Sequence, residues 1–305
     1  MSFGLSTAWN AFRHKQARQL IFEIKELGFG EVELSFNLTP AMVDDIAQLT
    51  GEGEIKVVSV HNYCPIPDGL FRQQALPDYY SLASQDEAER QLAIRFTKKS
   101  IDTARLLGAG ILVLHAGRVE IPDRTSELIR IYSAAGKDTK EFIALRDSMI
   151  KQRQDHAARF FEKTLQSLEE IDCYAREHDL YVGIETRFYY REIPSFEEFI
   201  MLWEKFPGSH LLYWHDTGHA QIREYLGFER HRDYLESFGS YLIGAHLHDI
   251  TGCQDHKAPF TGELDFSWLK PYIGKQGVIK IIEAHHPASG KDIMQGRDKL
   301  QAMLA

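Results

Sequence analysis

The stretch that decides the fold reads Trp-His-Asp-Thr-Gly-His-Ala and occupies residues 214–220. An apolar run at 211–213 precedes it, so the sequence predicts a buried strand that ends at Asp216. The next two residues break the strand, and His219 follows in the turn. A carboxylate and an imidazole three residues apart at a strand end are suitable ligands for a hard or borderline divalent metal.

The same pattern recurs along the chain. Five further apolar runs end on one histidine or acid, and their last residues are His61, His115, Glu185, His246 and Glu283. Side chains alternate along a strand, so the residue two positions earlier points the same way as each terminal polar group. Several of these inward partners are small, namely Ser59, Gly183 and Gly244. Small residues beneath a polar layer leave room for it, and six such strand ends predict a site.

Strands alternate with helices throughout the sequence. Besides these six strands, we expect strands at 3–7 and 31–34, and helices at 16–27, 39–49, 86–107, 157–178, from Ser195, 222–238, 266–272 and 290–304. Ser195 with Glu198 three residues later forms the sequence pattern of a capping box. Eight strands alternating with helices predict an α/β fold, the (β/α)8 TIM barrel, as a single domain over 1–305, with its site at the carboxyl ends of the strands.

Two segments depart from this alternation. The loop 62–84 is long and rich in proline and aromatic residues, so we expect it to be ordered over the top of the barrel. Residues 117–156, after strand four, are polar and helix-forming, with a break at Gly136. This segment is too polar for a core of its own, and we interpret it as a helical insertion that acts as a lid or binds a partner.

Composition limits the classes of function. The chain has 305 residues and a formal net charge of −9, which disfavours broad contact with nucleic acid or an anionic membrane. No run approaches the ~18 apolar residues that span a bilayer. The three cysteines are far apart and form no CxxC pair, which is typical of reduced thiols, and no leader precedes the first strand, so we expect a cytoplasmic protein. Assembly into a homo-oligomer is compatible with the sequence.

Four strand-end residues would converge on one point: Glu185, Asp216, His246 and Glu283. Three carboxylates crowded together repel one another unless a cation lies between them. Three oxygens and one nitrogen suit Mn²⁺, Mg²⁺, Zn²⁺ or Co²⁺. Other polar residues near the strand ends could hold a second or third metal or bind substrate hydroxyls, and these are His61, His115, His219, Asp255 and His256.

Several residues have a plain structural interpretation beside the functional one. Arg118 and Arg187 follow strand ends and are candidates for binding a substrate oxygen, carboxylate or phosphate.

His248 shares the inward face with His246, so it could replace His246 as a ligand or have a structural role. Taken alone, His61 is typical of a hydrogen-bonded core histidine. A salt bridge inside the barrel is the alternative for Asp216 and Glu283, but Lys and Arg are scarce there and unpaired buried charge is costly. The aromatic residues 188–190 suit stacking on a sugar or contact with a lid.

With these residues in place, the chain resembles the sugar phosphate isomerase/epimerase superfamily. This superfamily of xylose isomerase-like TIM barrels includes keto-sugar 3-epimerases, inosose dehydratases and the zinc-dependent apurinic endonucleases of family 2. The resemblance covers nearly the whole chain and rests on Ile184-Glu185, Asp216-Thr217-Gly218-His219, His246-Leu247-His248-Asp249, Asp255-His256 leading to Gly262, and Glu283. In the epimerase branch it implies that the residues matching Glu185, Asp216, His246 and Glu283 hold one metal, and that the two glutamates exchange the substrate proton.

The resemblance thus implies a divalent-metal-dependent sugar isomerase or epimerase of carbohydrate metabolism. Its substrate would be a small sugar, keto-sugar or related polyol carbonyl, and the reaction would pass through an enediolate. A metal bound to the carbonyl and the adjacent hydroxyl acidifies the hydrogen on the carbon between them. Glu185 and Glu283 on opposite faces of the sugar would remove and return the proton as the catalytic pair. Mn²⁺ and Zn²⁺ rank first as cofactors, before Mg²⁺ and Co²⁺.

Other functions fit many of the same residues. An apurinic endonuclease, a zinc-dependent phosphodiester hydrolase, uses nine metal ligands, and the chain offers a candidate for each. That family separates the Asp and His of the seventh-strand loop by one residue, whereas Asp255 and His256 are adjacent here. Neighbouring side chains in an extended segment point apart, which argues against joint metal binding by this pair. The chain also lacks a basic stripe with interleaved aromatics, so we expect no nucleic-acid partner. A sugar or inosose dehydratase is a further alternative, as is a sugar-binding protein without catalysis, which would need no facing carboxylates.

Overall fold

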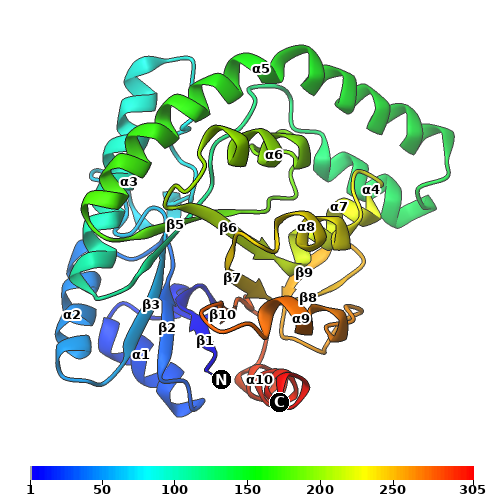
Figure 1. The fold of residues 1–305 in the computed structure, drawn as a ribbon. Coiled ribbons are helices and arrows are strands. Elements are labelled where there is room, and N and C mark those ends of the chain that lie inside the picture. Colours follow the sequence, from blue (N-terminus) through cyan, green and yellow to red (C-terminus); the bar gives the residue numbers. More distant parts are fainter. Residues whose placement is uncertain (1) are drawn as a thin grey trace.

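The computed structural model describes residues 2–305, and its centre is a closed barrel of eight parallel strands (Figure 1). The barrel strands are β1 Gly4–Ser6, β2 Glu31–Leu34, β3 Lys56–His61, β4 Ile111–Leu114, β5 Tyr181–Glu185, β6 Leu211–Asp216, β7 Leu242–Leu247 and β10 Ile279–Ile282. They follow one another around the barrel in chain order, and β10 closes it against β1. The predicted (β/α)8 barrel is confirmed.

Helices surround the strands as an outer layer. They are α1 Ala17–Glu26, α2 Pro40–Gly51, α3 Glu87–Leu106, α4 Thr125–Ala135, α5 Lys140–Glu177, α6 Phe196–Lys205, α7 Thr217–Tyr225, α8 His231–Phe238, α9 Lys270–Ile273 and α10 Gly290–Leu304. The predicted capping box forms, because the Ser195 hydroxyl accepts from the Glu198 amide and the Glu198 carboxylate accepts from the Ser195 amide. The start of α6 therefore lies where the sequence places it.

The segment after β6 differs from the prediction. The sequence predicted a turn at His219 and one helix over 222–238, but α7 begins directly at Thr217 and a second helix, α8, follows it. The side chain of Asp216 is the reason: it accepts a hydrogen bond from the His219 amide at 2.7 Å and caps the helix. Gly227, with φ at 71°, separates the two helices.

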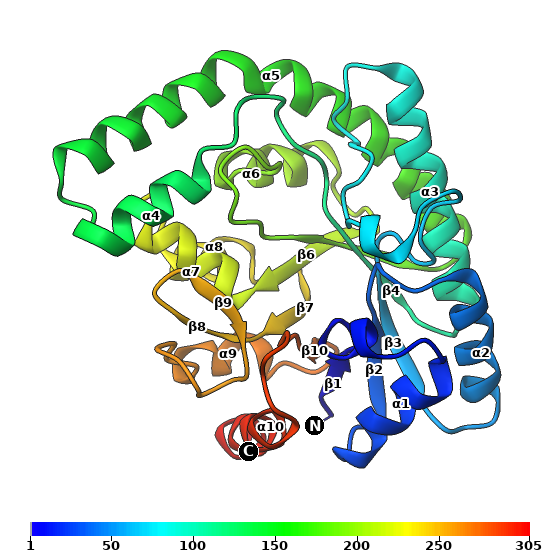
Figure 2. The same cartoon turned by 180° about the vertical axis from the view of Figure 1, so that it is seen from behind.

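The insertion is less separate than the sequence predicted. The helix expected at 157–178 begins at Lys140, so α5 is one helix of 38 residues that joins the insertion to the barrel wall. The break at Gly136 is confirmed, with φ at 77°. Figures 1 and 2 show the first half of α5 extending past the barrel, with α4 beside α7. The apolar faces of α4 and α5 pack on the barrel side in a cluster of Leu128, Ile131, Phe142, Leu145, Met149, Ile222, Leu226 and Ile250.

A hairpin replaces the loop that the sequence predicted after β7. It consists of β8 Asp249–Thr251 and β9 Gln254–Lys257. The Asp249 carboxylate accepts from the amides of Ile250, Gly262 and Leu264 and so fixes the chain that follows. A Cβ atom on Gly262 would lie 2.1 Å from the Ile250 carbonyl oxygen, so this close approach requires glycine.

Trp214 fills the barrel directly beneath the site. Its indole is fully buried among barrel residues, and its ring centroid lies 5.0 Å from that of His246. A Cβ atom on Gly244 would lie 2.1 Å from Cζ3 of Trp214, and one on Gly183 would lie 3.0 Å from Cε3. The small residues predicted to make room for a polar layer therefore make room for this indole, which forms the floor of the site.

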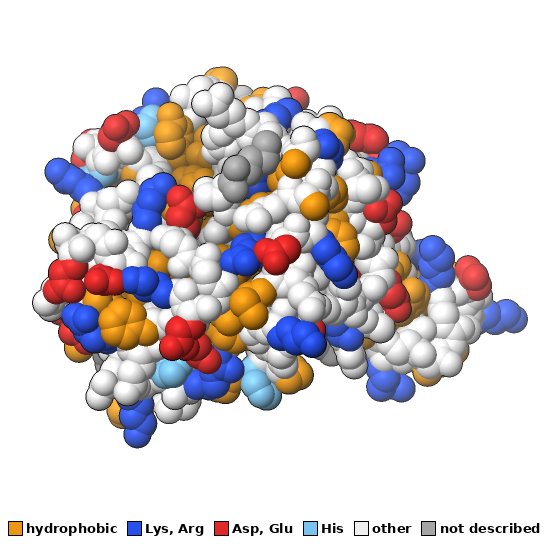
Figure 3. Space-filling view, turned by 90° about the horizontal axis from the view of Figure 1, so that it is seen from below, with side chains coloured by type: hydrophobic (Ala, Val, Ile, Leu, Met, Phe, Trp, Pro, Cys, Tyr) orange, Lys and Arg blue, Asp and Glu red, His pale blue; other side chains and the backbone are white. Residues whose placement is uncertain are grey.

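The face of the molecule seen from below relative to Figure 1 carries mixed charge (Figure 3). On the described part of the face seen in Figure 3, acidic and basic side chains are interspersed without a continuous basic stripe. Within residues 2–305, none of the helices is both long enough and apolar enough to span a bilayer.

Candidate metal centre

Four strand-end side chains meet at the centre of the barrel mouth, as predicted. Glu185, Asp216, His246 and Glu283 are buried, and each offers a ligand atom within 4.8 Å of the others. Nδ1 of His246 lies 3.3 Å from Glu185 Oε1, 3.6 Å from Asp216 Oδ2 and 3.0 Å from Glu283 Oε2. We refer to these four residues as the central cluster.

Glu33 belongs to the site but was not among the predicted site residues. Its Oε1 lies 2.9 Å from His246 Nε2, and its Oε2 accepts from the Ser59 hydroxyl at 2.8 Å. With the proton assigned to Nε2, the ring donates to Glu33 and turns Nδ1 toward the central cluster. The sequence signal is weak, because β2 reads Glu-Val-Glu-Leu and no apolar run precedes Glu33.

A second group of ligand atoms lies on the side of β3 and β4. Nε2 of His61 and of His115 lie 3.3 Å and 2.8 Å from Glu185 Oε2. The three residues meet the same 4.8 Å criterion as the central cluster. Glu185 thus presents Oε1 to the central cluster and Oε2 to the two histidines, so it could bridge two ions.

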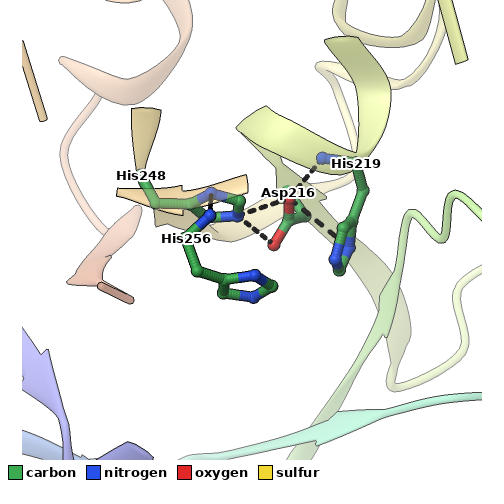
Figure 4. Close-up of side chains that lie close together, drawn as sticks. All are labelled: Asp216, His219, His248 and His256. Carbon is green, nitrogen blue, oxygen red and sulfur yellow. Dashed lines mark hydrogen bonds and ion pairs between the residues drawn. The ribbon is translucent and has the colours of Figure 1, made fainter. Parts of the chain in front are cut away.

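A third group surrounds Asp216 and contains His219, His248 and His256 (Figure 4). Nε2 of His248 lies 2.9 Å and 3.0 Å from the two Asp216 oxygens, and Nδ1 of His219 lies 3.4 Å from Oδ1. His248 therefore joins this group and does not take the place of His246. A fourth group links His256 with Glu283 and His285.

Asp255 and His256 are closer to each other than strand geometry predicted. His256 has φ at 54°, which takes it out of the extended conformation. As a result its Nδ1 lies 3.2 Å from Asp255 Oδ1, while Asp255 Oδ2 lies 3.7 Å from His219 Nε2. The expectation that these two neighbouring side chains point apart is wrong, and both face the site.

The two candidate arginines lie in different places. Arg187 lines the cavity, where its guanidinium lies 3.5 Å from Glu185 Oε1 and 3.2 Å from Glu192 Oε1. Arg118 donates to the carbonyl and carboxylate of Asp78 and lies outside the cavity wall. The structure therefore brings only Arg187 of this pair to the site and shows Arg118 holding the loop 62–84.

The carboxylates of the central cluster are held in their charged form. Burial raises the pKa of Glu185, but the Arg187 guanidinium and His115 outweigh it and hold this pKa well below its usual range. Burial likewise raises the pKa of Glu283, and His246 and His256 outweigh it and lower this pKa. Both glutamates are therefore anionic at neutral pH.

The imidazoles supply the balancing positive charge. Burial lowers the pKa of His246, but Glu283 and Glu33 raise it well above its usual value. Asp255 and Glu283 raise the pKa of His256 to about 10 against the effect of burial. A divalent cation among the same atoms supplies the same charge and would displace these protons.

A cavity of about 260 Å³ opens above the clusters. Phe36, Pro77, Phe188 and Tyr189 form its apolar walls, and Pro77 places the loop 62–84 over the barrel mouth, as predicted. Tyr190, the third residue of the aromatic run, instead stacks on Phe228 at 4.1 Å and so makes a contact away from the cavity.

The donor set fits a divalent metal. Carboxylate oxygens and imidazole nitrogens are the ligands that Zn²⁺, Mn²⁺ and related ions prefer. Within the described residues, three buried polar atoms of the site lack a hydrogen-bond partner: His115 Nδ1, Asp255 Oδ2 and His285 Nε2. Buried polar atoms without partners are uncommon, and here they are the kind of atom that binds an ion or a substrate hydroxyl.

Comparison with known proteins identifies the fold and the family. Solved structures of similar fold include a D-tagatose 3-epimerase-like protein (TM-score 0.69, 18% identity, 100% of this chain and 97% of that one) and an L-ribulose 3-epimerase (0.69, 14%, 100% and 95%). A third is the 3-keto-D-glucoside 4-epimerase YcjR from E. coli (0.68, 15%, 99% and 99%). At these identities the likeness shows the fold alone, and a comparison with curated proteins found no match. The family model of the xylose isomerase-like TIM barrel matches residues 21–303, and the chain therefore belongs to this family.

Proposed function

We propose that this protein is a divalent-metal-dependent isomerase or epimerase acting on a small sugar, keto-sugar or related polyol carbonyl. One observation carries the proposal: two buried, anionic glutamates approach the same imidazole nitrogen from different strands. Glu185 Oε1 lies 3.3 Å and Glu283 Oε2 lies 3.0 Å from His246 Nδ1. β6 and β7 separate their strands in the barrel, so the two carboxylates can flank one substrate carbon.

The chain's own groups have distinct roles in this proposal. A metal held by the central cluster would supply Lewis-acid polarisation of the carbonyl and the neighbouring hydroxyl. One of Glu185 and Glu283 accepts the proton from carbon as a carboxylate. The other takes up a proton when the substrate binds and delivers it to the opposite face, so the two side chains end the reaction with their protonation states exchanged. Arg187, at the cavity wall, donates to a substrate oxygen. Glu33 keeps the ring of His246 in the orientation that points Nδ1 inward.

The size of the cavity and the comparisons support a small sugar unit at the reacting position. A volume of about 260 Å³ lies just below the ~300–1,000 Å³ of most small-molecule sites, so the cavity suits a reacting unit no larger than one sugar ring. Proteins of similar fold carry the names of tagatose, ribulose and glucoside epimerases.

The test combines elemental analysis with a screen of ketoses in deuterated solvent. We expect a bound divalent metal, loss of activity after its removal by a chelator, and incorporation of solvent deuterium at one carbon. Glu283→Gln should keep sugar affinity and lose turnover, whereas Glu26→Gln, at an exposed glutamate of α1, should retain both. Unchanged turnover of Glu283→Gln would remove Glu283 from its catalytic role, and absence of deuterium exchange with every ketose would refute the proposal.

A second candidate function rests on the additional clusters. Glu185 and Asp216 are each shared between two groups of ligand atoms, an arrangement that suits several ions and phosphodiester hydrolysis. Metal stoichiometry separates the two functions. One ion per chain together with ketose turnover supports the epimerase, whereas three zinc ions together with cleavage of abasic DNA would replace it with the endonuclease.

A further inference from the structure

A second and larger cavity lies next to the candidate site. It has a volume of about 590 Å³ and is bounded by the β8–β9 hairpin and by the segment from 285 to the start of α10. Asp255, His256 and His285 line both cavities. The first cavity, at about 260 Å³, is smaller than the ~300–1,000 Å³ of most small-molecule sites, and the second falls within that range.

The boundary between the cavities is thin and lies beside the central cluster. Nε2 of His256 is 3.6 Å from Glu283 Oε2, so the second cavity begins one imidazole away from that carboxylate. The ring of His285 stacks on that of His256 with centroids 3.8 Å apart. Within the described residues, Nε2 of His285 is buried without a hydrogen-bond partner. A ligand that crosses this boundary would meet an unsatisfied polar atom there.

We propose that the second cavity binds a further glycosyl unit, so that the substrate is a glycoside or oligosaccharide. Its reacting unit occupies the first cavity, and the attached sugar ring lies across His256 and His285 in the second. This inference rests on the proposed sugar chemistry at the central cluster and deepens it by naming the substrate class.

The lining suits an uncharged polyhydroxylated ring. Lys257 forms no ion pair among residues 2–305 and can donate to hydroxyls, as can the imidazole of His286, while Asp255 and Asp292 can accept from them. A phosphate in the same place would meet the carboxylates of Asp255 and Asp292, whose negative charge offsets the attraction of Lys257. A sugar ring needs both donors and acceptors, and this mixed lining provides them.

An exposed aromatic side chain contacts the wall of the second cavity. His286, on the wall of the second cavity, contacts Phe12 in an edge-to-face arrangement with ring centroids 5.1 Å apart. Phe12 is 54% exposed, which is unusual for phenylalanine, and the Arg13 guanidinium lies over its ring at 5.4 Å from the centroid.

The test measures binding of three kinds of ligand to the metal-loaded protein by calorimetry. The probes are free D-fructose and D-tagatose, the fructose-containing disaccharides lactulose, turanose and isomaltulose, and fructose 6-phosphate. We expect at least one disaccharide to bind about tenfold more tightly than its free ketose, equivalent to ~1.4 kcal/mol. Thr261→Trp should fill the second cavity and abolish this gain without changing the affinity for free ketose.

Two further variants keep the test decisive. Thr251→Trp places the same bulk at an exposed position of β8 outside the cavity and should preserve the gain. Lys257→Ala should reduce the gain and serves if Thr261→Trp does not fold. Ketose turnover with no preference for any disaccharide would overturn this inference and leave the proposed function standing. If fructose 6-phosphate binds more tightly than every disaccharide, the inference is overturned in favour of an anion site. If no ketose and no disaccharide binds, both this inference and the proposed function are overturned.

Discussion

Replacement of Gly244 by alanine tests the packing beneath the site. Carbon atoms in contact lie about 3.5–4.0 Å apart. The new methyl group would lie 2.1 Å from Cζ3 of Trp214, so the indole or the strand must move by more than an ångström. The closed barrel leaves little space for such a shift, because the indole is fully buried among barrel side chains.

The expected magnitude follows from this overlap. Overpacking a core by one methyl group costs roughly 1–3 kcal/mol, and the severe contact places Gly244→Ala at the upper end. The backbone at 244 lies outside the left-handed region, so strain in φ adds nothing. We expect a loss of about 2–3 kcal/mol and a decrease in Tm of roughly 3–5 °C. Because His246 is two residues away on the same strand, metal affinity should fall as well.

A matched control lies in β5, on the other side of the strand that carries Trp214. A Cβ atom on Gly183 would lie 3.0 Å from Cε3 of the same indole, a contact that a shift of a few tenths of an ångström relieves. Alanine also favours a strand over glycine by ~0.5–1 kcal/mol, which offsets the crowding. Gly183→Ala should therefore remain within about 1 kcal/mol of the parent protein in thermal and urea unfolding.

The double variant with Trp214→Leu decides whether the indole is the cause. If it is, Gly244→Ala should cost little in the Trp214→Leu background, with a coupling energy of about 2 kcal/mol. An equal cost of Gly244→Ala in both backgrounds would refute the reasoning. So would a loss no larger than that of Gly183→Ala.

Three other predictions address the site and its surroundings. Glu33→Gln should weaken metal binding by about 10–100-fold, because it removes the carboxylate that orients the His246 imidazole. Competition with a chelator measures the affinity, and an unchanged value would exclude this role for Glu33. Tyr213→Phe breaks hydrogen bonds to a buried threonine and a buried histidine and should cost about 1–3 kcal/mol in urea unfolding. The control Tyr174→Phe loses only an exposed hydrogen bond and should stay within ~0.5 kcal/mol; equal losses would contradict the prediction. In a thiol titration of the folded protein, the exposed Cys173 should react first. Burial raises the pKa of Cys64, so this thiol should stay unreactive until the protein unfolds. A fast phase that persists in Cys173→Ser would contradict this assignment.

The sequence predicts the barrel and the central cluster because the same rule applies at each strand. A buried parallel strand is apolar until it emerges at the carboxyl end, so the first polar side chain on the inward face lies in the site. Glu185, Asp216 and His246 all follow this rule and meet as predicted. Glu33 does not follow it, because Glu31 stands two residues earlier in a strand of four residues and no apolar run precedes the acid.

Other features depend on geometry that residue type does not encode. The convergence of Asp255 and His256 depends on a positive φ at a non-glycine residue, which no local pattern signals. The predicted turn after β6 is a helix because the same carboxylate that faces the cluster also caps α7. The continuity of α5 was hidden because its first half is polar and carries only a narrow apolar face.

The dual contact of Asp216 ties the barrel mouth to the periphery. Its Oδ1 accepts a hydrogen bond from the His219 amide in the first turn of α7, while its Oδ2 lies 3.6 Å from Nδ1 of His246. Ile222 and Leu226, along and just after α7, are packed against the long arm formed by α4 and α5. Binding of a cation at the barrel mouth would therefore act on Asp216, the residue that caps α7, and α7 in turn supports the arm of α4 and α5. Amide protons in the first turn of α7 should therefore exchange with solvent more slowly once a metal ion is bound at the central cluster. Their exchange rates would report whether the metal site is occupied.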